Sequence, residues 1–399
     1  MKILHLCDSI NPAGLGGYES YLTTLAAWMK TQGHETIIAT QAAKRDAPRI
    51  EHFATHVIVR LRGNLLEARK WEFFSLPPEE REEAVGRMFR RNDLESNVSL
   101  LVQELGELVR NTSPDVIHAH STYVVFNRAL EQLMQDDQLD VPIVLTVHGL
   151  PKSLVLPSGE RTTDYAQLSK HCPFVQVYGV SEHVTSELRR HLPSSVKVQT
   201  LYLGVDVNTF APRKTGLKQW DLAFMGRIEV EKGVYLFPEM LQHLVAWKRH
   251  LKMVITGEGS YRRQLLRELE EANLGGHVTY LGVVPSETVP HVLNSSRVFL
   301  YPSTREPFGL SIVEAMACGL PVISTDAYGP TEIITHEWDG ILVKPGDAEE
   351  LMTAARTLLA DEEQRHAIAR AARETVLKRF TIDRHARSVC ECYEVMIKR

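Results

Sequence analysis

The feature that most constrains the fold of this chain is a repeated alternation of short apolar runs with longer segments of helical periodicity. The apolar runs are Lys2–Cys7, Thr36–Thr40, Val116–His120, Ile143–His148, Asp221–Met225, Lys252–Thr256, Val278–Leu281, Val298–Tyr301 and Pro321–Ser324. Short buried strands that alternate with helices are typical of parallel sheets covered by helices on both faces. The sequence therefore predicts an α/β fold with doubly wound parallel sheets.

The length of the chain predicts two such sheets. It has 399 residues, and single cores rarely grow beyond about 250–300 residues. The segment Leu203–Pro212 has turn residues and no periodicity, and Trp220–Met225 then restarts a strand. We expect an N-terminal domain over 1–203, completed by a last helix over 381–399, and a C-terminal domain over 204–380. Ligands of such folds bind at the carboxyl ends of the strands, so we expect a cleft between the two domains.

Composition excludes several classes of protein. The net charge is −5 and the pI is about 6.4, whereas nucleic-acid-binding domains are usually basic. No apolar run approaches the ~18 residues of a membrane span. The five scattered cysteines lack zinc spacing and are expected to be reduced, which favours a cytoplasmic location. Residues 51–113 combine basic, aromatic and acidic runs. They fit a solvated insertion helix, or a surface for an acceptor or the inner face of a membrane.

The segment 303–326 carries the most informative acids. A helix is expected from about Gly309 to Cys318, and Glu314 lies on its apolar stripe. A carboxylate taken out of water needs hydrogen-bond donors, so we expect either a structural Arg or Lys partner or the hydroxyls of a ligand such as a ribose. Glu306 lies in the preceding loop. The N–H groups that open the helix belong to Phe308, Gly309 and Leu310.

Two further segments suit a phosphorylated ligand. Gly14, Gly16 and Gly17 lie between a strand and a helix, where they form either a tight structural turn or an anion site at a helix start. Arg227 and Lys232 flank a loop that follows a strand; they could clamp a diphosphate or be surface cations. Together with the two acids they provide what a nucleotide sugar requires.

These motifs resemble the retaining glycosyltransferases of family 4, which have the GT-B fold of two Rossmann-like domains. The resemblance runs nearly from end to end. In chain order, the matching segments are GLGGYE, DVIHAH, LTVHG, LGVDVNTFAP, GRIEVEKGV and EPFGLSIVE, the last of which fits the family's E-x7-E motif. All six in this order make a specific match.

The resemblance implies a role for each matching residue. Arg227 and Lys232 bind the donor diphosphate, Glu314 holds the ribose, and Glu306 contacts the donor sugar. Backbone groups of Phe308, Gly309 and Leu310 touch sugar and phosphate, and Gly16 and Gly17 close over the phosphates. His120 lies beside the reacting carbon, with His148 nearby. For each histidine, a purely structural role in the core stays open.

Departures from the family pattern concern the substrates. Leu203 replaces a usual Asn, Tyr328 begins a loop that is usually Gly-Gly-x-x-Glu, and Tyr18 replaces a small residue beside the acceptor site. The resemblance therefore leaves the identity of the donor sugar open.

The reaction that the resemblance implies is retaining transfer of a sugar from a nucleoside-diphosphate sugar to an acceptor hydroxyl, in the synthesis of a cell-surface glycan, a glycolipid or a small glycoside. No Asp-x-Asp occurs, so neither a metal nor another cofactor is expected. The alternatives are an epimerase or hydrolase of the same fold, or a non-catalytic subunit that binds nucleotide sugar.

Overall fold

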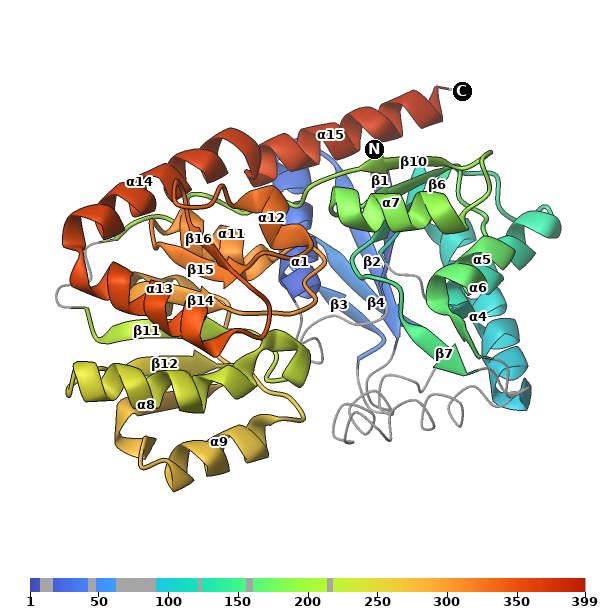
Figure 1. The fold of residues 1–399 in the computed structure, drawn as a ribbon. Helices are drawn as coiled ribbons and strands as arrows, with labels where there is room; N and C mark the ends of the chain where they lie inside the picture. The colour runs from blue at the N-terminus through green and yellow to red at the C-terminus, as the bar shows by residue number, and fades with distance from the viewer. Residues whose placement is uncertain are drawn as a thin grey trace. The chain divides into compact units, whose positions relative to one another are not determined.

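The computed structural model describes residues 1–7, 17–41, 48–61, 91–120, 124–155, 161–213 and 218–398. These residues divide into two compact units. The first unit comprises residues 1–14, 22–202 and 386–399, and the second comprises 15–21 and 203–385. Each unit has a parallel sheet with helices on both sides (Figure 1).

The sheet of the first unit has eight strands among the described residues, in the order β10-β9-β6-β5-β1-β2-β4-β3. All neighbours are parallel except β3 and β4. The strands are β1 (Lys2–Leu6), β2 (Glu35–Gln41), β3 (Ile50–His52), β4 (Val57–Leu61), β5 (Val116–Ala119), β6 (Ile143–Val147), β9 (Gln176–Gly179) and β10 (Lys197–Thr200). A separate hairpin pairs β7 (Ser153–Val155) with β8 (Arg161–Thr163).

Helices connect these strands, as parallel pairing requires. They are α1 (Gly17–Thr31), α4 (Arg91–Thr112), α5 (Val124–Gln135), α6 (Asp164–Lys170) and α7 (Glu182–His191). The last helix, α15 (Ile382–Ile397), ends in the first unit, and its Tyr393 is fully buried there. The core of this unit is thus a mostly apolar sheet between amphipathic helices.

The second unit has a sheet of six parallel strands in the order β13-β12-β11-β14-β15-β16. The strands are β11 (Trp220–Met225), β12 (Met253–Thr256), β13 (Val278–Gly282), β14 (Ser296–Tyr301), β15 (Val322–Thr325) and β16 (Ile341–Val343). Its helices are α8 (Phe237–Trp247), α9 (Arg262–Glu271), α10 (Val289–Asn294), α11 (Leu310–Ala317), α12 (Gly329–Ile333), α13 (Ala348–Ala360) and α14 (Glu362–Arg379). The strand order reverses between β11 and β14, so the carboxyl ends of these two strands form the switch point where ligands of such folds bind.

The interpretation of residues 51–113 as a solvated insertion helix is wrong for the part that the structure describes. Residues 57–61 form β4, which is buried next to β2 in the sheet. The helix α4 packs on α5 and buries Val98, Leu101, Leu105 and Val109. Both are core elements: β4 is buried at four of its five positions, and the apolar residues of α4 recur with the period of a helix. Residues 62–90, which hold Arg69, Lys70 and the aromatic cluster, lie outside the described residues.

One arginine fixes the segment that joins β10 to β11. The Arg373 guanidinium of α14 donates hydrogen bonds to the carbonyls of Val207 (2.9 Å), Phe210 (2.6 Å) and Ala317 (2.5 Å). A single planar group thereby satisfies three backbone acceptors, which holds the irregular segment 203–213 against α11 and α14.

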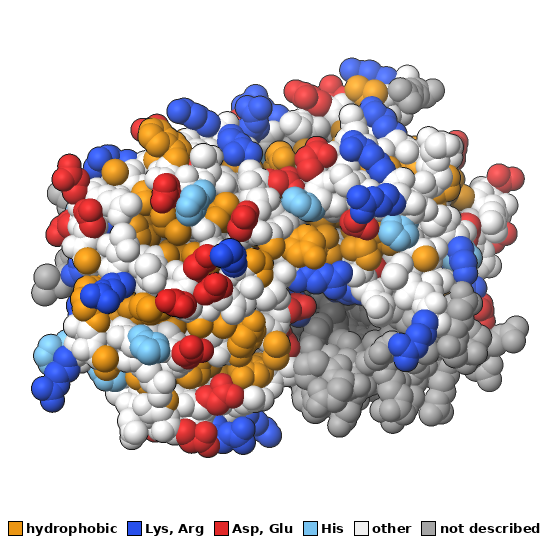
Figure 2. Space-filling model, viewed as in Figure 1, with side chains coloured by type: hydrophobic (Ala, Val, Ile, Leu, Met, Phe, Trp, Pro, Cys, Tyr) orange, Lys and Arg blue, Asp and Glu red, His pale blue; other side chains and the backbone are white. Residues whose placement is uncertain are grey.

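Three further observations concern the helices, the surface charges and the thiols. None of the described helices is both long and apolar enough to cross a bilayer. On the face drawn in Figure 2, acidic and basic side chains of the described residues are interspersed rather than gathered by sign. All five cysteines are free thiols.

Candidate active site

A buried ion pair forms the centre of the candidate site in the second unit. The Lys232 ammonium donates to Glu306 Oε2 at 2.7 Å, and the Tyr301 hydroxyl donates to the same oxygen at 2.9 Å. The two charged side chains are only 7% and 11% exposed. Burial, reinforced by the negative charge of Glu306, raises the pKa of Tyr301 well above 10, so this hydroxyl stays a donor. The sequence motifs placed Lys232 and Glu306 in one site, and the fold brings them into contact.

Backbone packing explains why Lys232 reaches this position. Lys232 ends a short 3-10 helix, and Gly233 follows with a φ of 72°, in the left-handed region that favours glycine. A Cβ at Gly233 would lie 2.0 Å from the carbonyl oxygen of Pro302. The loop after β11 is therefore pressed against the loop after β14, and these two loops supply Lys232 and Glu306.

A second contact ties the β11 loop to the loop after β12. Glu229 accepts hydrogen bonds from the backbone N–H (3.0 Å) and the hydroxyl (2.7 Å) of Ser260. Cβ atoms at Gly257 and Gly259 would lie 1.9 Å and 2.2 Å from backbone oxygens of this β11 loop. The backbones of the loops after β11 and β12 therefore pack closely against each other at the strand ends, which restricts movement of the β11 loop.

Arg227 is the more exposed of the two predicted cations. Its guanidinium donates to Glu231 at 2.9 Å, and its side chain is 35% exposed. The interpretation of both cations as surface residues is thus wrong for Lys232, which is buried, while Arg227 stays accessible to an anion. Arg227 lies close enough to Tyr301 for its charge to lower the pKa of that hydroxyl, against the larger effect of burial.

Of the two partners expected for Glu314, a structural Arg or Lys is not found among the described residues, and the hydroxyls of a ligand remain. No hydrogen bond or ion pair reaches its side chain from the part of the chain that the structure describes. It lies on α11, partly exposed, and burial raises the pKa of its carboxyl from 4.5 to about 8. An acid in this state is available to hydroxyl groups that come from outside the protein.

The start of α11 offers backbone donors. Gly309 precedes the helix with a φ of 109°, and no side chain caps the helix. The first N–H groups of an α-helix have no partner within it and carry partial positive charge. Phe308 itself is buried, with its ring edge-on to Phe380 at 5.9 Å, so only its backbone is offered to a ligand.

Two other segments lie against this helix start. A Cβ at Gly17 would lie 3.4 Å from Leu310 Cδ2, so the beginning of α1 contacts α11. Gly16 lies outside the described residues, as does the side chain of Tyr18. On the other side, the Gly329 N–H donates to the Glu306 carbonyl at 3.0 Å. Tyr328, which replaces a usual glycine, has a φ of 55°.

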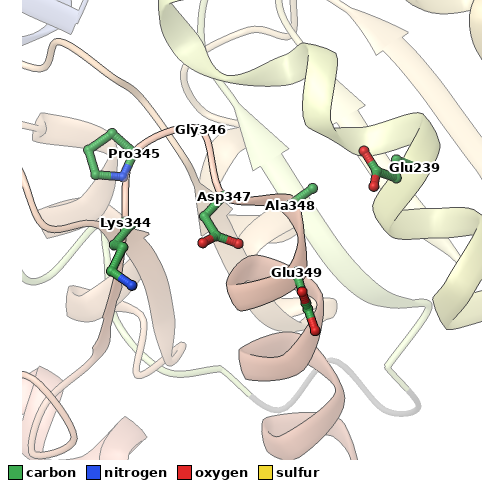
Figure 3. A pocket seen from close by; sticks show the side chains of 7 residues that line it. All are labelled: Glu239, Lys344, Pro345, Gly346, Asp347, Ala348 and Glu349. Atoms are coloured by element: carbon green, nitrogen blue, oxygen red, sulfur yellow. The ribbon is translucent and has the colours of Figure 1, made fainter.

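A hollow elsewhere in the second unit does not suit the predicted ligand. It has a volume of about 430 Å³ and is lined by Glu239 of α8 and residues 344–349, as Figure 3 shows. Three of these side chains are acidic, and one of them, Asp347, caps α13 by accepting from the Glu350 N–H. None of the residues predicted from the sequence lines it, and its acids would repel a diphosphate.

The predicted histidines belong to the first unit. His120 is 1% exposed and contacts three other histidine rings. Its Nε2 lies 2.8 Å from His5 Nδ1, its Nδ1 lies 3.3 Å from His148 Nε2, and its ring stacks on that of His118. His118 bonds Thr146 at 2.7 Å and also bonds the Tyr393 hydroxyl. His120 and His148 are thus brought together, whereas the acids and cations of the site belong to the second unit.

Sequence reasoning missed Tyr301, His5 and His118. In the sequence, Tyr301 stands only as the last residue of an expected strand. His5 and His118 are paired in register across β1 and β5, and alternation puts His120 on the same face as His118. The spacing His118-x-His120 was the available signal that both rings lie on one face.

Two family models together match most of the chain. Residues 15–209 match the model "Glycosyltransferase Family 4", and residues 208–375 match "Glycosyl transferases group 1". A sulfoquinovosyl transferase of Arabidopsis thaliana is 33% identical over 311 residues, which span 71% of this chain and 57% of that protein.

Solved structures have the same fold. Sucrose-phosphate synthase of Thermosynechococcus elongatus superposes with a TM-score of 0.80 at 21% identity, covering 100% of this chain and 99% of its own. HepE of Anabaena, in complex with UDP and glucose, has a TM-score of 0.71 at 20% identity, with 99% of both chains covered. The chain therefore has the GT-B fold and belongs to the family 4 glycosyltransferases, enzymes of the transferase class.

Proposed function

We propose that this glycosyltransferase moves a sugar from a nucleoside-diphosphate sugar to an acceptor hydroxyl with retention of anomeric configuration and without a metal ion. The observation that carries the proposal is the buried Lys232–Glu306 pair at the carboxyl ends of β11 and β14. A buried ion pair adds little net stability. Its place beside the uncapped start of α11 suits the binding of an anion and a sugar together.

The donor diphosphate would be held by Lys232, Arg227 and the N–H groups at the start of α11. Charge develops on the diphosphate as the bond to the sugar breaks, and fixed donors stabilise that charge without reorganising. Lys232 has three N–H donors and can keep Glu306 while it contacts a phosphate. Glu306 Oε1 accepts a long hydrogen bond from the backbone N–H of Phe308, with an N···O distance of 3.4 Å. This weak bond leaves the oxygen able to accept from a sugar hydroxyl.

Glu314 would accept hydrogen bonds from the ribose hydroxyls. Its lack of a protein donor among the described residues and the raised pKa of its carboxyl both favour a hydroxyl-bearing ligand. The complex of HepE with UDP and glucose supports a uridine nucleotide as the first donor to test.

In the step that we propose, the bond between the anomeric carbon and the phosphate oxygen breaks. The acceptor oxygen forms a bond to that carbon on the same face, and its proton passes to the departing phosphate oxygen. His120 and His148 would contact the sugar or the acceptor. Expulsion of water from the site would prevent loss of the donor by hydrolysis.

The test is release of nucleoside diphosphate from UDP-, GDP- and ADP-sugars, with and without a panel of hydroxyl acceptors. We expect the release of nucleoside diphosphate to depend on the acceptor. The rate should fall by at least about 100-fold in Lys232→Ala, which is the typical effect of removing one donor that stabilises charge in the transition state. Lys344→Ala is the matched control, because Lys344 is an exposed lysine paired with Glu350.

Three results would contradict the proposal. Turnover without an acceptor would indicate a hydrolase or an epimerase. No release from any donor would indicate a binding subunit, and equal rates in the Lys232 and Lys344 variants would refute the site itself.

A further inference from the structure

Two donors converge on one oxygen of the Glu306 carboxylate. The Lys232 ammonium and the Tyr301 hydroxyl both donate to Oε2, at 2.7 Å and 2.9 Å. The other oxygen, Oε1, accepts only the 3.4 Å bond from the Phe308 N–H among the described residues. Each carboxylate oxygen has two lone pairs, so Oε2 is fully used by the protein, whereas Oε1 keeps capacity for a ligand.

The ring that carries the Tyr301 hydroxyl is held by packing. Tyr301 is buried, and its ring is stacked with those of Phe224 and Phe299, at centroid distances of 6.0 Å and 6.1 Å. A Cβ at Gly226 would lie 3.3 Å from Tyr301 Cε2, so the backbone after β11 also lies against this ring. The Tyr301 carbonyl accepts a 2.8 Å bond from the Ser324 hydroxyl, which ties the end of β14 to β15. The position of the phenolic hydroxyl is therefore fixed.

The two donors to Glu306 differ in how far they can move. Lys232 has three N–H groups on a flexible stem, and it can turn toward a phosphate. Tyr301 has a single O–H on a rigid ring. Burial, reinforced by the charge of Glu306, raises the pKa of this hydroxyl well above 10, so it stays a donor. Glu306 therefore has one partner whose direction does not depend on whether a nucleotide is bound.

We propose that Tyr301 is a positioning residue that holds the Glu306 carboxylate so that its Oε1 meets one hydroxyl of the donor sugar. Tyr301 itself contacts neither the sugar nor the diphosphate and acts through Glu306. Without its hydroxyl, Oε2 would be left to Lys232 alone, and the carboxylate would turn with the ammonium. This inference rests on the proposed function, in which Glu306 contacts the donor sugar, and it names the residue that makes this contact selective.

A fixed acceptor in a buried place discriminates between sugars. A site that is built to hydrogen-bond a hydroxyl rejects an analogue that lacks it, because a buried polar group is then left unpaired. Glu306 is buried, so water would compensate poorly for a missing hydroxyl at Oε1. A carboxylate that can turn finds another donor, and the penalty falls. The Tyr301 hydroxyl should therefore be measurable as selectivity for one position of the sugar ring.

A purely structural role is the competing interpretation of Tyr301. A hydroxyl that only satisfied a buried carboxylate would stabilise the fold, and its removal would change the rates with all donors by the same factor. Donors that differ at one sugar hydroxyl separate the two roles, because only the positioning role couples Tyr301 to one particular hydroxyl.

The experiment measures kcat/KM for the wild type and Tyr301→Phe. The donors are the nucleotide sugar with the fastest release and analogues of it that each lack one sugar hydroxyl. We expect Tyr301→Phe to lose about 10- to 100-fold with the parent donor and with every analogue except one, the typical range for a hydrogen bond to a charged group. With the analogue that lacks the hydroxyl bound by Glu306, the two chains should differ by less than about 3-fold. Equal losses with all donors would overturn the proposal.

Binding of the nucleoside diphosphate without a sugar gives a second readout. Its Kd should stay within about 3-fold of the wild type in Tyr301→Phe, because the groups proposed to hold the diphosphate are unchanged. A larger change would overturn the proposal, since the effect would then lie on the diphosphate. Tyr261→Phe is the matched control: its hydroxyl bonds the Glu268 carboxylate at 3.0 Å on α9, and its rates should equal those of the wild type with every donor.

Thermal unfolding of both variants precedes the kinetics. Phenylalanine keeps the ring contacts of Tyr301, so we expect Tyr301→Phe to fold. A chain that fails to fold, while Tyr261→Phe folds, would assign the hydroxyl a structural role and overturn the proposal. Absence of turnover in the wild type would contradict the proposed function itself. Turnover in the wild type with equal losses in Tyr301→Phe would contradict only the role of Tyr301.

Discussion

Replacing Glu314 with glutamine should make the folded chain more stable at neutral pH while it weakens nucleotide binding. The carboxyl has a pKa of about 8 in the fold and 4.5 ordinarily. The folded chain thus holds a proton that the unfolded chain releases, so stability falls as the pH rises from 4.5 to 8. At pH 7 the shift of this pKa lowers the free energy of unfolding by about 3 kcal/mol relative to a chain whose residue 314 cannot ionise. Solvent reaches part of the side chain, and screening reduces this to roughly 1–3 kcal/mol.

The assay is urea denaturation of the wild type and of Glu314→Gln between pH 5 and pH 8.5. Glutamine cannot ionise, so the advantage of the variant should be small at pH 5, reach roughly 1–3 kcal/mol at pH 7 and level off above pH 8. Glu363→Gln, an exposed acid at the start of α14, should show no such rise. A difference that stays flat with pH would refute the reasoning that the Glu314 carboxyl is held neutral by burial.

Three further substitutions test the backbone and loop geometry. Tyr328→Gly should raise stability by about 1 kcal/mol in thermal unfolding, because it relieves a positive φ; an unchanged Tm would contradict the strain. Gly233→Ala should cost more than about 2 kcal/mol and abolish turnover, because its Cβ would collide with Pro302; a stable, active variant would argue against a fixed Lys232. Arg373→Ala should cost about 2–4 kcal/mol in urea denaturation, because three carbonyls lose their donor, and a loss below about 0.5 kcal/mol would show that water replaces it.

Much of the fold could be predicted because buried parallel strands are apolar along their whole length. Runs such as Met253–Thr256 and Ile143–Val147 are buried at every position, so they stand out against the helices between them. The alternation of the two element types then specifies parallel pairing. That is why the two doubly wound sheets were predicted from the sequence.

Three of the strands that were missed give a weaker signal. Lys197–Thr200 is an edge strand with alternating exposure, and Ile341–Val343 has only three residues. Gln176–Gly179 is buried but includes a polar residue at its start. Short, half-polar edge strands cannot be distinguished from loops by periodicity, because their stability comes from the neighbouring strand.

The contacts within the site were less predictable than the residues. Lys232 and Glu306 were chosen from motifs, but their contact spans 74 positions and depends on the packing of Gly233 against Pro302. Tyr301 donates a hydrogen bond to Glu306 in this pair. The sequence does not indicate this role, because a tyrosine at the end of a strand is common. The helix stripe left two kinds of partner open for Glu314, and only the structure shows that no Arg or Lys of the described residues is its partner.

The most direct test of the account is a crystal structure of the chain with whichever of UDP, GDP and ADP binds most tightly. The account predicts diphosphate oxygens within hydrogen-bonding distance of Lys232 Nζ and the Arg227 guanidinium, with the ribose hydroxyls on Glu314. A nucleotide bound elsewhere, with Lys232 contacting only Glu306 and Tyr301, would contradict it.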